Sequence, residues 1–397
     1  MIWYLISITD LILFVMVGFT VLYLSVFAIA SVFYSNFQAP TSRRKARFLI
    51  LMPARECGDN YEATLKALEA QDYDRRNFDI LVVSSGNRPL TNMKLAQHNL
   101  SLQIMPEGAY SDLLAWKFGI THSSALRIYD MVVILEAGET VGPDYLTDIN
   151  EAFQLGSKAI QTHRIIPERK TKSAIISASF EEINASIFRM GHVAMGLSSG
   201  LAGSGMAFEY KWFRENIVRL PDNGDLKALE ALVLRERKYV DYLDKTIYYA
   251  KPEVSVTSIT QKRQGWMYAQ WYALRTNIGS LLPALLHRNY DLFDKIIQWM
   301  LMPRLAMMSV ITIMALVTPF FWWSMTLKWI AIGLWVAFIY AVATPDYLVD
   351  KNWERASYHT PLVMLRTFFY ALPTGWLYVF ARNRKDEWRE DIKELIE

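Results

Sequence analysis

A long apolar run opens the chain. Asp10 is the only formally charged side chain before Arg43, and residues 11–33 form an uncharged run of 23 residues. A helix of that length measures about 35 Å and can cross a bilayer core of about 30 Å. The run has no basic segment before it and is longer than the apolar part of a signal peptide. Residues 1–42 are therefore predicted to contain a transmembrane helix.

Basic side chains follow this run directly. Residues 43–47 contain four Lys or Arg residues, and such a cluster beside a span marks its cytoplasmic side. We therefore expect an integral protein of the inner (cytoplasmic) membrane, with its N-terminus outside and the following domain in the cytosol.

Residues 43–255 alternate between two kinds of apolar pattern. Short apolar or β-branched runs predict buried strands, at residues 47–52, 78–83, 102–105 and 131–135. Helical spacing of apolar residues predicts helices between them, at residues 60–70, 111–121 and 143–155. Pro53 is expected to end the first strand. The alternation predicts an α/β domain with a mostly parallel sheet covered on both faces, whose ligands bind beyond the carboxyl ends of the strands.

Apolar runs return in the last third of the chain. Aromatic and basic residues mix over residues 256–300, which predicts amphipathic helices at a membrane interface. Residues 301–345 hold an uncharged run of 23 residues before Lys328 and one of 17 residues after it. They predict a transmembrane hairpin that turns near residues 324–328. Residues 346–397 carry an apolar stretch with basic flanks on both sides, which predicts an interfacial or re-entrant segment and a basic C-terminal tail.

Composition narrows the class of protein. The chain has 42 Lys and Arg against 39 Asp and Glu, and a net charge of +3 gives no basic footprint for nucleic acid. A hydrophobic content of 52% excludes a disordered chain. Cys57 is the single cysteine, so a disulfide framework is impossible and a reducing compartment suits the domain.

Five short motifs follow one another along the chain: ILMPARE at residues 50–56, AQDY at 70–73, VILEAGE at 133–139, GSGMAF at 203–208 and QKRQGW at 261–266. In this order, between these apolar segments, they resemble motifs of the membrane-anchored family-2 glycosyltransferases, the group that contains the cellulose, hyaluronan and poly-N-acetylglucosamine synthases. The resemblance covers about residues 47–388. It implies a GT-A-like, nucleotide-sugar-binding domain and a hexosyltransferase of polysaccharide biosynthesis that works with inversion.

The same resemblance implies the partners of the chain. They are a nucleotide-sugar donor, a glycan or lipid-linked acceptor, the lipid bilayer, and either a partner synthase or a second copy of the chain. Nucleic acid is not among them.

The metal-binding motif of the family is altered here. Its D-x-D becomes Glu136-Ala137-Gly138, so Glu136 keeps the first carboxylate and Gly138 replaces the usual ligand. Mg²⁺ and Mn²⁺ favour carboxylate oxygens, and we therefore expect weak or absent metal dependence, with Glu136 as the metal ligand if one binds. Glu136 and Glu139 are expected to contact the substrate. The alternative is that both are solvated loop acids, since Glu139 faces away from Glu136 unless the loop turns.

The general base of the family is an acid that opens a helix. In one register Asp225 is that base. In the other, aligned on Leu229 and Glu230, Asp225 stands for the preceding Glu and Leu226 replaces the base. A third interpretation is an acid that only stabilises a helix N-terminus.

Two further motifs concern substrate binding. The resemblance assigns three residues to the acceptor-side loop, Gly203, Ser204 and Gly205; the alternative is a tight glycine turn. The Q-x-x-R-W motif, anchored on Trp266, has Lys262 in place of Gln and Gly265 in place of Arg. Trp266 keeps an aromatic face for a sugar, and Lys262 and Arg263 carry positive charge toward a diphosphate. The alternative is a helix at headgroup level.

These changes leave two hypotheses open. The first is an active glycosyltransferase with altered motifs. The second is a catalytically silent relative, a pseudoenzyme, that serves as a partner or scaffold subunit of a glycan synthesis complex, because fold alone does not carry function.

Overall fold

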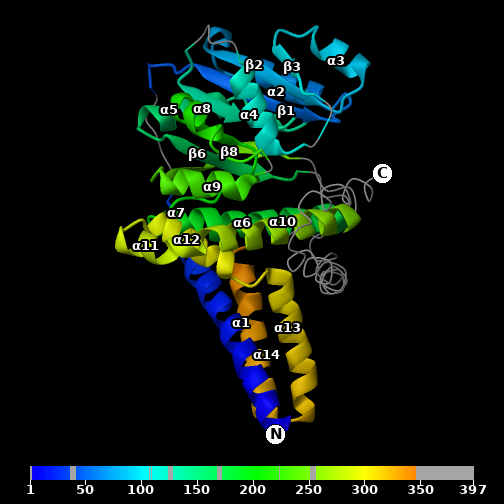
Figure 1. Cartoon of the computed structure of the whole chain (residues 1–397), viewed down its shortest axis with the longest axis vertical. Helices are drawn as coiled ribbons and strands as arrows, with labels where there is room; N and C mark the ends of the chain where they lie inside the picture. Colours follow the sequence, from blue (N-terminus) through cyan, green and yellow to red (C-terminus); the bar gives the residue numbers. More distant parts are fainter. Residues whose placement is uncertain are drawn as a thin grey trace.

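The computed structural model describes residues 2–35, 42–106, 108, 110–123, 128–167, 172–222, 224–250 and 256–345. The segment expected to be interfacial or re-entrant, residues 346–397, lies outside this range. Figure 1 shows three layers: an α/β domain, a layer of helices beneath it, and apolar helices that project away from both.

A single mixed sheet forms the centre of the α/β domain. Within the described residues its strand order is β3-β2-β1-β4-β7-β6-β8-β5. The strands in chain order are β1 Phe48–Arg55, β2 Phe78–Ser85, β3 Ser101–Ile104, β4 Met131–Ile134, β5 Thr140–Val141, β6 Ala159–Ile165, β7 Met206–Glu209 and β8 Val240–Tyr249. Strands β3, β2, β1 and β4 are parallel, as are β6 and β8, whereas β7 and the short β5 run antiparallel to their neighbours. The predicted α/β fold with a mostly parallel sheet is confirmed.

The first strand continues through Pro53 to Arg55, so the expectation that Pro53 ends it is wrong. The pairing of β1 with β4 stops at Leu51 and Ile134. The carbonyl oxygen of Pro53 then accepts a hydrogen bond from the Ala137 backbone nitrogen at 3.0 Å. Because β4 has already ended on this side of β1, the missing N–H of the proline interrupts no regular ladder there, while β2 stays paired with β1 as far as Arg55.

Helices cover both faces of the sheet, and alternate residues of each strand serve the two sides. Ile50 and Met52 of β1 lie in one core with side chains of α2 and α5, and Leu49 and Leu51 lie in the other with α4, α8 and α9. The bounds of these helices are α2 Tyr61–Glu69, α4 Asp112–His122, α5 Tyr145–Gln154, α8 Tyr210–Ile217 and α9 Leu226–Arg235, with α3 Pro89–Leu95 and the 3-10 helix η1 Arg75–Asn77 beside them.

A layer of helices separates the sheet from the apolar helices (Figure 1). It contains α6 Lys172–Ala185, the π-helical turn η2 Ser186–Met190, α7 Gly191–Ala194, α10 Val256–Asn277, η3 Ile278–Ser280, α11 Leu281–Leu286 and α12 Tyr290–Met300. Buried residues of α9, α10, α11 and α12 form a separate core, which includes Leu234, Ala273 and Trp299.

Three apolar helices project from this layer. They are α1 Ile2–Val32, α13 Arg304–Val317 with the 3-10 helix η4 Thr318–Phe320, and α14 Trp323–Val342. Among the described residues, α1 and α14 are long and apolar enough to cross a bilayer, and α13 with η4 contributes a shorter apolar helix. This assignment follows from the length and the apolar composition of the helices.

The turn of the hairpin lies earlier than expected. It falls at residues 318–322, where η4 contains Pro319, and not at residues 324–328. Lys328, the charge that suggested the turn, lies inside α14 and forms an ion pair with Asp10 of α1. Trp329 Nε1 donates a second hydrogen bond to Asp10 at 2.8 Å. The charge is therefore neutralised between helices, as an ionisable group in an apolar bundle requires.

The base of α1 is packed tightly against the helical layer. A Cβ added to Gly191 would lie 2.2 Å from the carbonyl oxygen of Phe27, so only a glycine permits this approach. The His192 ring stacks on Phe27 with centroids 3.9 Å apart, and its Nε2 lies 3.0 Å from the Tyr23 hydroxyl. The Tyr23 hydroxyl also donates to Asp294 at 2.9 Å. These contacts join α1 to α7 and α12.

Candidate functional site

The carboxyl end of β4 meets the glycine–serine–glycine loop of residues 203–205. The Gly205 backbone nitrogen donates to the Ile134 carbonyl at 2.9 Å. The Ser204 hydroxyl accepts from the Glu136 backbone nitrogen at 3.2 Å and donates to the Glu139 carboxylate. The structure thus brings together two acids and a loop that lie about 65 residues apart in the sequence, at the sheet edge where α/β proteins bind ligands.

Gly205 holds this loop in place. Its φ is +62°, and an added Cβ would lie 2.3 Å from the ring of Tyr248. Its carbonyl accepts hydrogen bonds from the Thr162 backbone nitrogen at 2.9 Å and the Thr162 hydroxyl at 2.8 Å. Residues 203–205 therefore form a glycine turn, and the contacts of Gly205 with Thr162 and Tyr248 hold it in place.

The segment after β4 turns, so that Glu136 and Glu139 lie in different environments. The Glu139 backbone nitrogen donates to the Glu136 carbonyl at 3.1 Å, and Gly138 adopts a φ of +97°. Glu139 is 5% exposed, and its Oε2 accepts from the Glu136 backbone nitrogen and Ser204. The Glu136 side chain is exposed. The interpretation of Glu139 as a solvated acid is therefore wrong, since its carboxylate stabilises the loop.

The loop after β4 offers few ligand atoms for a divalent cation. No group of three or more His, Cys, Asp or Glu side chains that could hold a metal occurs in the described part of the chain. Glu136 is the exposed carboxylate of the loop, because Glu139 is engaged by Ser204. An aspartate at Gly138 would have to adopt a left-handed backbone conformation, which is unfavourable for residues other than glycine. The side chains of this loop therefore do not fit a divalent cation.

Arg55, at the carboxyl end of β1, is a cation beside this loop that the motif analysis did not single out. Its guanidinium lies 4.8 Å from the ring centroid of Tyr110. Burial, followed by the charges of Asp112 and Glu136, raises the pKa of Tyr110, which places the tyrosine within electrostatic range of Glu136. The ILMPARE segment contains this residue, directly after the apolar run that predicted the first strand.

Asp225 lies at the start of α9 and caps it. Its Oδ1 accepts from the Ala228 backbone nitrogen at 3.1 Å, and the residue is half-buried. The next residue, Leu226, lies against the loop of residues 203–205, since its Cδ2 would be 3.8 Å from a Cβ at Gly203. The capping role is thus present, and the residue that follows Asp225 lies next to Gly203.

Trp266 lies on α10, near the first turn of α9. Its side chain is 49% exposed, and Lys227 Nζ lies 5.4 Å from its ring centroid. Lys262 and Arg263 lie on the same helix, but their side chains are outside the described part of the chain. The structure therefore places Trp266 beside Lys227, two residues after Asp225.

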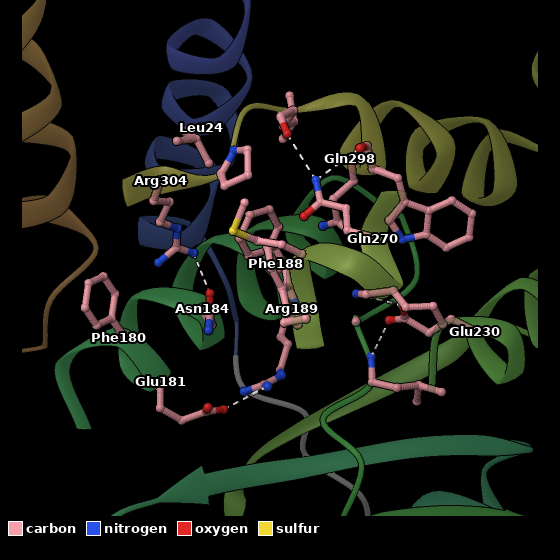
Figure 2. Close-up of a pocket in the computed structure, with 18 of the residues that line it drawn as sticks. Leu24, Phe180, Glu181, Asn184, Phe188, Arg189, Glu230, Gln270, Gln298 and Arg304 are labelled. Atoms are coloured by element: carbon pink, nitrogen blue, oxygen red, sulfur yellow. Dashed lines mark hydrogen bonds and ion pairs between the residues drawn. The ribbon is translucent and has the colours of Figure 1, made fainter. Parts of the chain in front are cut away.

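A cavity of about 350 Å³ lies between the α/β domain and the apolar helices. Figure 2 shows its walls, which come from α1, α6, α9, α10, α12 and the start of α13. Trp266 is part of its lining. Its charged side chains are five cations and two anions: Arg164, Arg189, Lys227, Lys295, Arg304, Glu181 and Glu230. No sequence motif predicted this set, because its members come from five separate segments.

Each acid of the cavity is shared between two cations. Glu181 lies 2.9 Å from Arg189 and 3.7 Å from Arg164. Burial raises the pKa of Glu181, but the charges of Arg189 and Arg164 outweigh it and the net pKa is lowered.

Glu230 behaves in the same way. It lies 3.3 Å from Lys295 and 3.5 Å from Lys227. Burial is again opposed by the two lysines, which bring the pKa of Glu230 down to about 2. Both acids are therefore ionised at neutral pH, and the cavity keeps an excess of three positive charges.

Comparison with known proteins identifies the fold. No family model and no curated protein matches the chain. A mannosyltransferase from Pyrobaculum calidifontis, solved with GDP-Man and Mn²⁺, is 13% identical, with a TM-score of 0.52 over 84% of this chain and 96% of that one. TarS from S. aureus is 12% identical, with a TM-score of 0.44 over 83% of this chain and 53% of that one. At this identity the likeness to the mannosyltransferase shows the fold alone, and it agrees with the expected α/β architecture with a mostly parallel sheet.

Proposed function

We propose that the chain is a membrane-bound, inverting glycosyltransferase that moves a sugar from a nucleotide diphosphate donor to a glycan or lipid-linked acceptor. The observation that carries this proposal is the meeting of Glu136, the 203–205 loop and the N-terminus of α9 with Asp225 at one edge of the sheet. The neighbour of the same fold was solved with GDP-Man, which supports a nucleotide-sugar donor.

The reaction assigns a task to each side chain. The donor binds beyond the carboxyl ends of β1 and β4, where Arg55 supplies positive charge to the diphosphate. Asp225 accepts the proton of the acceptor hydroxyl. The hydroxyl oxygen then forms a bond to the anomeric carbon from the face opposite the diphosphate. The bond from that carbon to the diphosphate breaks, the nucleoside diphosphate leaves, and the configuration inverts.

Donor binding provides the direct test of this proposal. Calorimetric titration of the full chain with UDP and with GDP, each with and without Mn²⁺, is expected to show binding of one nucleotide with little dependence on the metal, because Glu136 alone offers an exposed carboxylate in the loop after β4. Tight binding that appears only with Mn²⁺ would mean that the acids of residues 136–139 form a working metal site. No binding of either nucleotide would remove the donor site.

The membrane assignment rests on apolar side chains that face away from the protein. Large exposed apolar residues lie along all three projecting helices, including Leu11, Phe19, Leu316, Leu334 and Phe338. The layer above them exposes Trp271, Tyr272, Leu282 and Leu286 on α10 and α11, a composition typical of helices at the headgroup level. We propose that α1, α13 and α14 span the inner membrane and that residues 256–300 lie at its cytoplasmic surface.

The orientation can be tested by cysteine labelling in intact cells. In a Cys57→Ser background, a cysteine near residue 1 is expected to react with a membrane-impermeant maleimide, whereas one at Asp144 is not. The reason is the basic cluster at residues 43–47, which should keep the α/β domain in the cytosol. The reverse labelling pattern would place the donor site on the side without nucleotide sugars.

A silent partner subunit is the second candidate function. It is favoured by the structural tasks of two acids: Asp225 caps α9, and Glu139 stabilises the loop through Ser204. Sugar transfer that appears only when a neighbouring synthase is co-expressed, and that survives the loss of Asp225, would support this candidate over the active enzyme.

A further inference from the structure

The cation-rich cavity holds more positive charge than its own acids neutralise. Arg304 is the cation without an acidic partner, since no carboxylate of the described residues lies within 4 Å of it. Its guanidinium instead donates to the Asn184 side-chain oxygen and lies 5.2 Å from the Phe188 ring centroid. An excess of buried charge is costly unless a ligand of opposite charge compensates it. The cavity therefore fits an anion.

Three nearly buried polar groups at the cavity wall have an atom with neither a hydrogen bond nor an ion pair among the described residues. Arg164 Nε, Glu181 Oε1 and Glu230 Oε2 also lack a hydrogen bond, but Arg164 is half-buried and the two acid oxygens lie in ion pairs. Arg189 is 5% exposed and its Nη1 is unpaired; Trp299 Nε1 is a second such donor. Gln270 is 6% exposed, and its Nε2 donates to the Trp299 and Leu301 carbonyls at 3.0 Å. Those two bonds fix the amide, so that Gln270 Oε1 is left as an unpaired acceptor (Figure 2).

These groups specify the ligand chemically. The arginine and tryptophan N–H groups require acceptor oxygens, and Gln270 Oε1 requires an O–H donor. A phosphate group supplies charge and several acceptor oxygens, and a sugar supplies the hydroxyl. Burial of unpaired donors and acceptors is unfavourable, so one ligand that satisfies all three is favoured over an apolar one.

The position of the cavity indicates a lipid. Thr20 and Leu24 of α1 and residues 302–304 line one side, at the base of the helices assigned to the membrane. Lys227 and Leu201 line the other side, two residues from Asp225 and Gly203 respectively. A molecule in the cavity therefore adjoins both the bilayer and the proposed reaction site.

We propose that the acceptor is a saccharide carried on a lipid through a phosphate group, and that this phosphate binds in the cavity near Arg304 and Arg189. The proposal rests on the proposed function. With the phosphate held there, the sugar of the acceptor extends toward α9, where its hydroxyl loses a proton to Asp225 and forms the new bond to the donor sugar. The phosphate itself is not transferred.

Binding of dodecyl phosphate to the full chain in phosphatidylcholine nanodiscs tests the proposal. Calorimetry is expected to show dodecyl phosphate binding at least tenfold tighter than dodecyl glucoside, which has the same alkyl chain but a neutral, hydroxyl-bearing head group in place of the phosphate. Arg304→Gln is expected to weaken dodecyl phosphate binding at least tenfold, the effect of one lost charge-assisted hydrogen bond. The matched control is Arg275→Gln, which removes the same charge from an exposed position on α10 outside the cavity, and it should change binding less than twofold.

Several outcomes would overturn the proposal. Equal affinity for dodecyl phosphate and dodecyl glucoside would show that the cavity does not select an anion, whether or not Arg304→Gln folds. Equal losses in the two arginine variants would indicate binding to the charged surface in general. Inorganic phosphate that binds as tightly as dodecyl phosphate would identify a site for a soluble anion instead of a lipid.

A parallel titration with UDP and GDP separates this proposal from the glycosyltransferase function. Nucleotide binding without dodecyl phosphate binding would overturn the lipid acceptor and leave the transferase. Dodecyl phosphate binding without nucleotide binding would overturn the acceptor role together with the transferase, and a phosphate-lipid site alone would remain.

Discussion

Replacement of Asp225 by asparagine is expected to abolish sugar transfer while the melting temperature hardly changes. Loss of a general base costs about 10²–10⁴-fold in rate. Asparagine is as good an N-cap as aspartate, and its side-chain oxygen can still accept the hydrogen bond that Asp225 Oδ1 receives from Ala228. The variant therefore separates the two tasks of the residue. Transfer rates and thermal unfolding of the same purified sample measure both.

Asp222 provides a matched control for this prediction. It is the other acid in the loop before α9, but its side chain is 71% exposed and forms an ion pair with Lys117. Asp222→Asn is thus expected to keep nearly the full rate. Wild-type activity in Asp225→Asn would remove Asp225 as the base. No transfer by the unmodified protein in native-like membranes, with UDP-, GDP- and dTDP-sugars, would favour the silent partner.

Local sequence patterns predicted four of the eight strands in the described residues, β1 to β4, and missed β5 to β8. Runs such as residues 78–83 and 131–135 are apolar on both faces, and that pattern has one stable location, the centre of a covered sheet. The long apolar helix α1 was equally plain, because its length and lack of charge need no tertiary information. The error at Pro53 arose because the cost of a proline depends on whether the neighbouring strand still pairs, and this partner lies about 80 residues away in the chain.

The hairpin turn was misplaced for a related reason. Lys328 marks a helix end only if its charge has no partner inside the bundle, and Asp10, its partner, lies at the other end of the sequence. The environment of Glu139 also depends on long-range contacts. Whether it faces solvent is decided by the turn at Gly138 and by Ser204, neither of which the spacing of residues 136–139 reveals.

The cavity and its buried charged residues could not be predicted from the sequence. Arg164, Glu181, Glu230 and Lys295 look like ordinary surface charges when each is considered with its sequence neighbours. Their burial follows from the packing of α6, α9 and α12 beneath the sheet, and short sequence motifs carry no information about that packing. By contrast, the tight glycine turn expected as the alternative at residues 203–205 is present, because Gly203 and Gly205 meet a local requirement for positive φ.

Substitution of Gly205 by alanine is expected to destabilise the α/β domain by about 2–5 kcal/mol. Two costs add: about 1–2 kcal/mol for a left-handed conformation in a residue with a Cβ, and about 1–3 kcal/mol for overpacking a filled core. The obstacle is the ring of Tyr248, which is fully buried and cannot swing aside. For a domain of this size the melting temperature should fall by roughly 4–20 °C.

Gly142→Ala is the control for this last prediction, since an added Cβ there has no atom within 4 Å and its φ lies outside the left-handed region. That variant should unfold within about 1 kcal/mol of the unmodified protein. Nucleotide and dodecyl phosphate binding should both weaken in Gly205→Ala, because residues 203–205 contact both the end of β4 and the first residue of α9. A melting temperature unchanged in Gly205→Ala would mean that residues 203–205 adopt another conformation, and the contacts of Ser204 with Glu136 and Glu139 would no longer support the site.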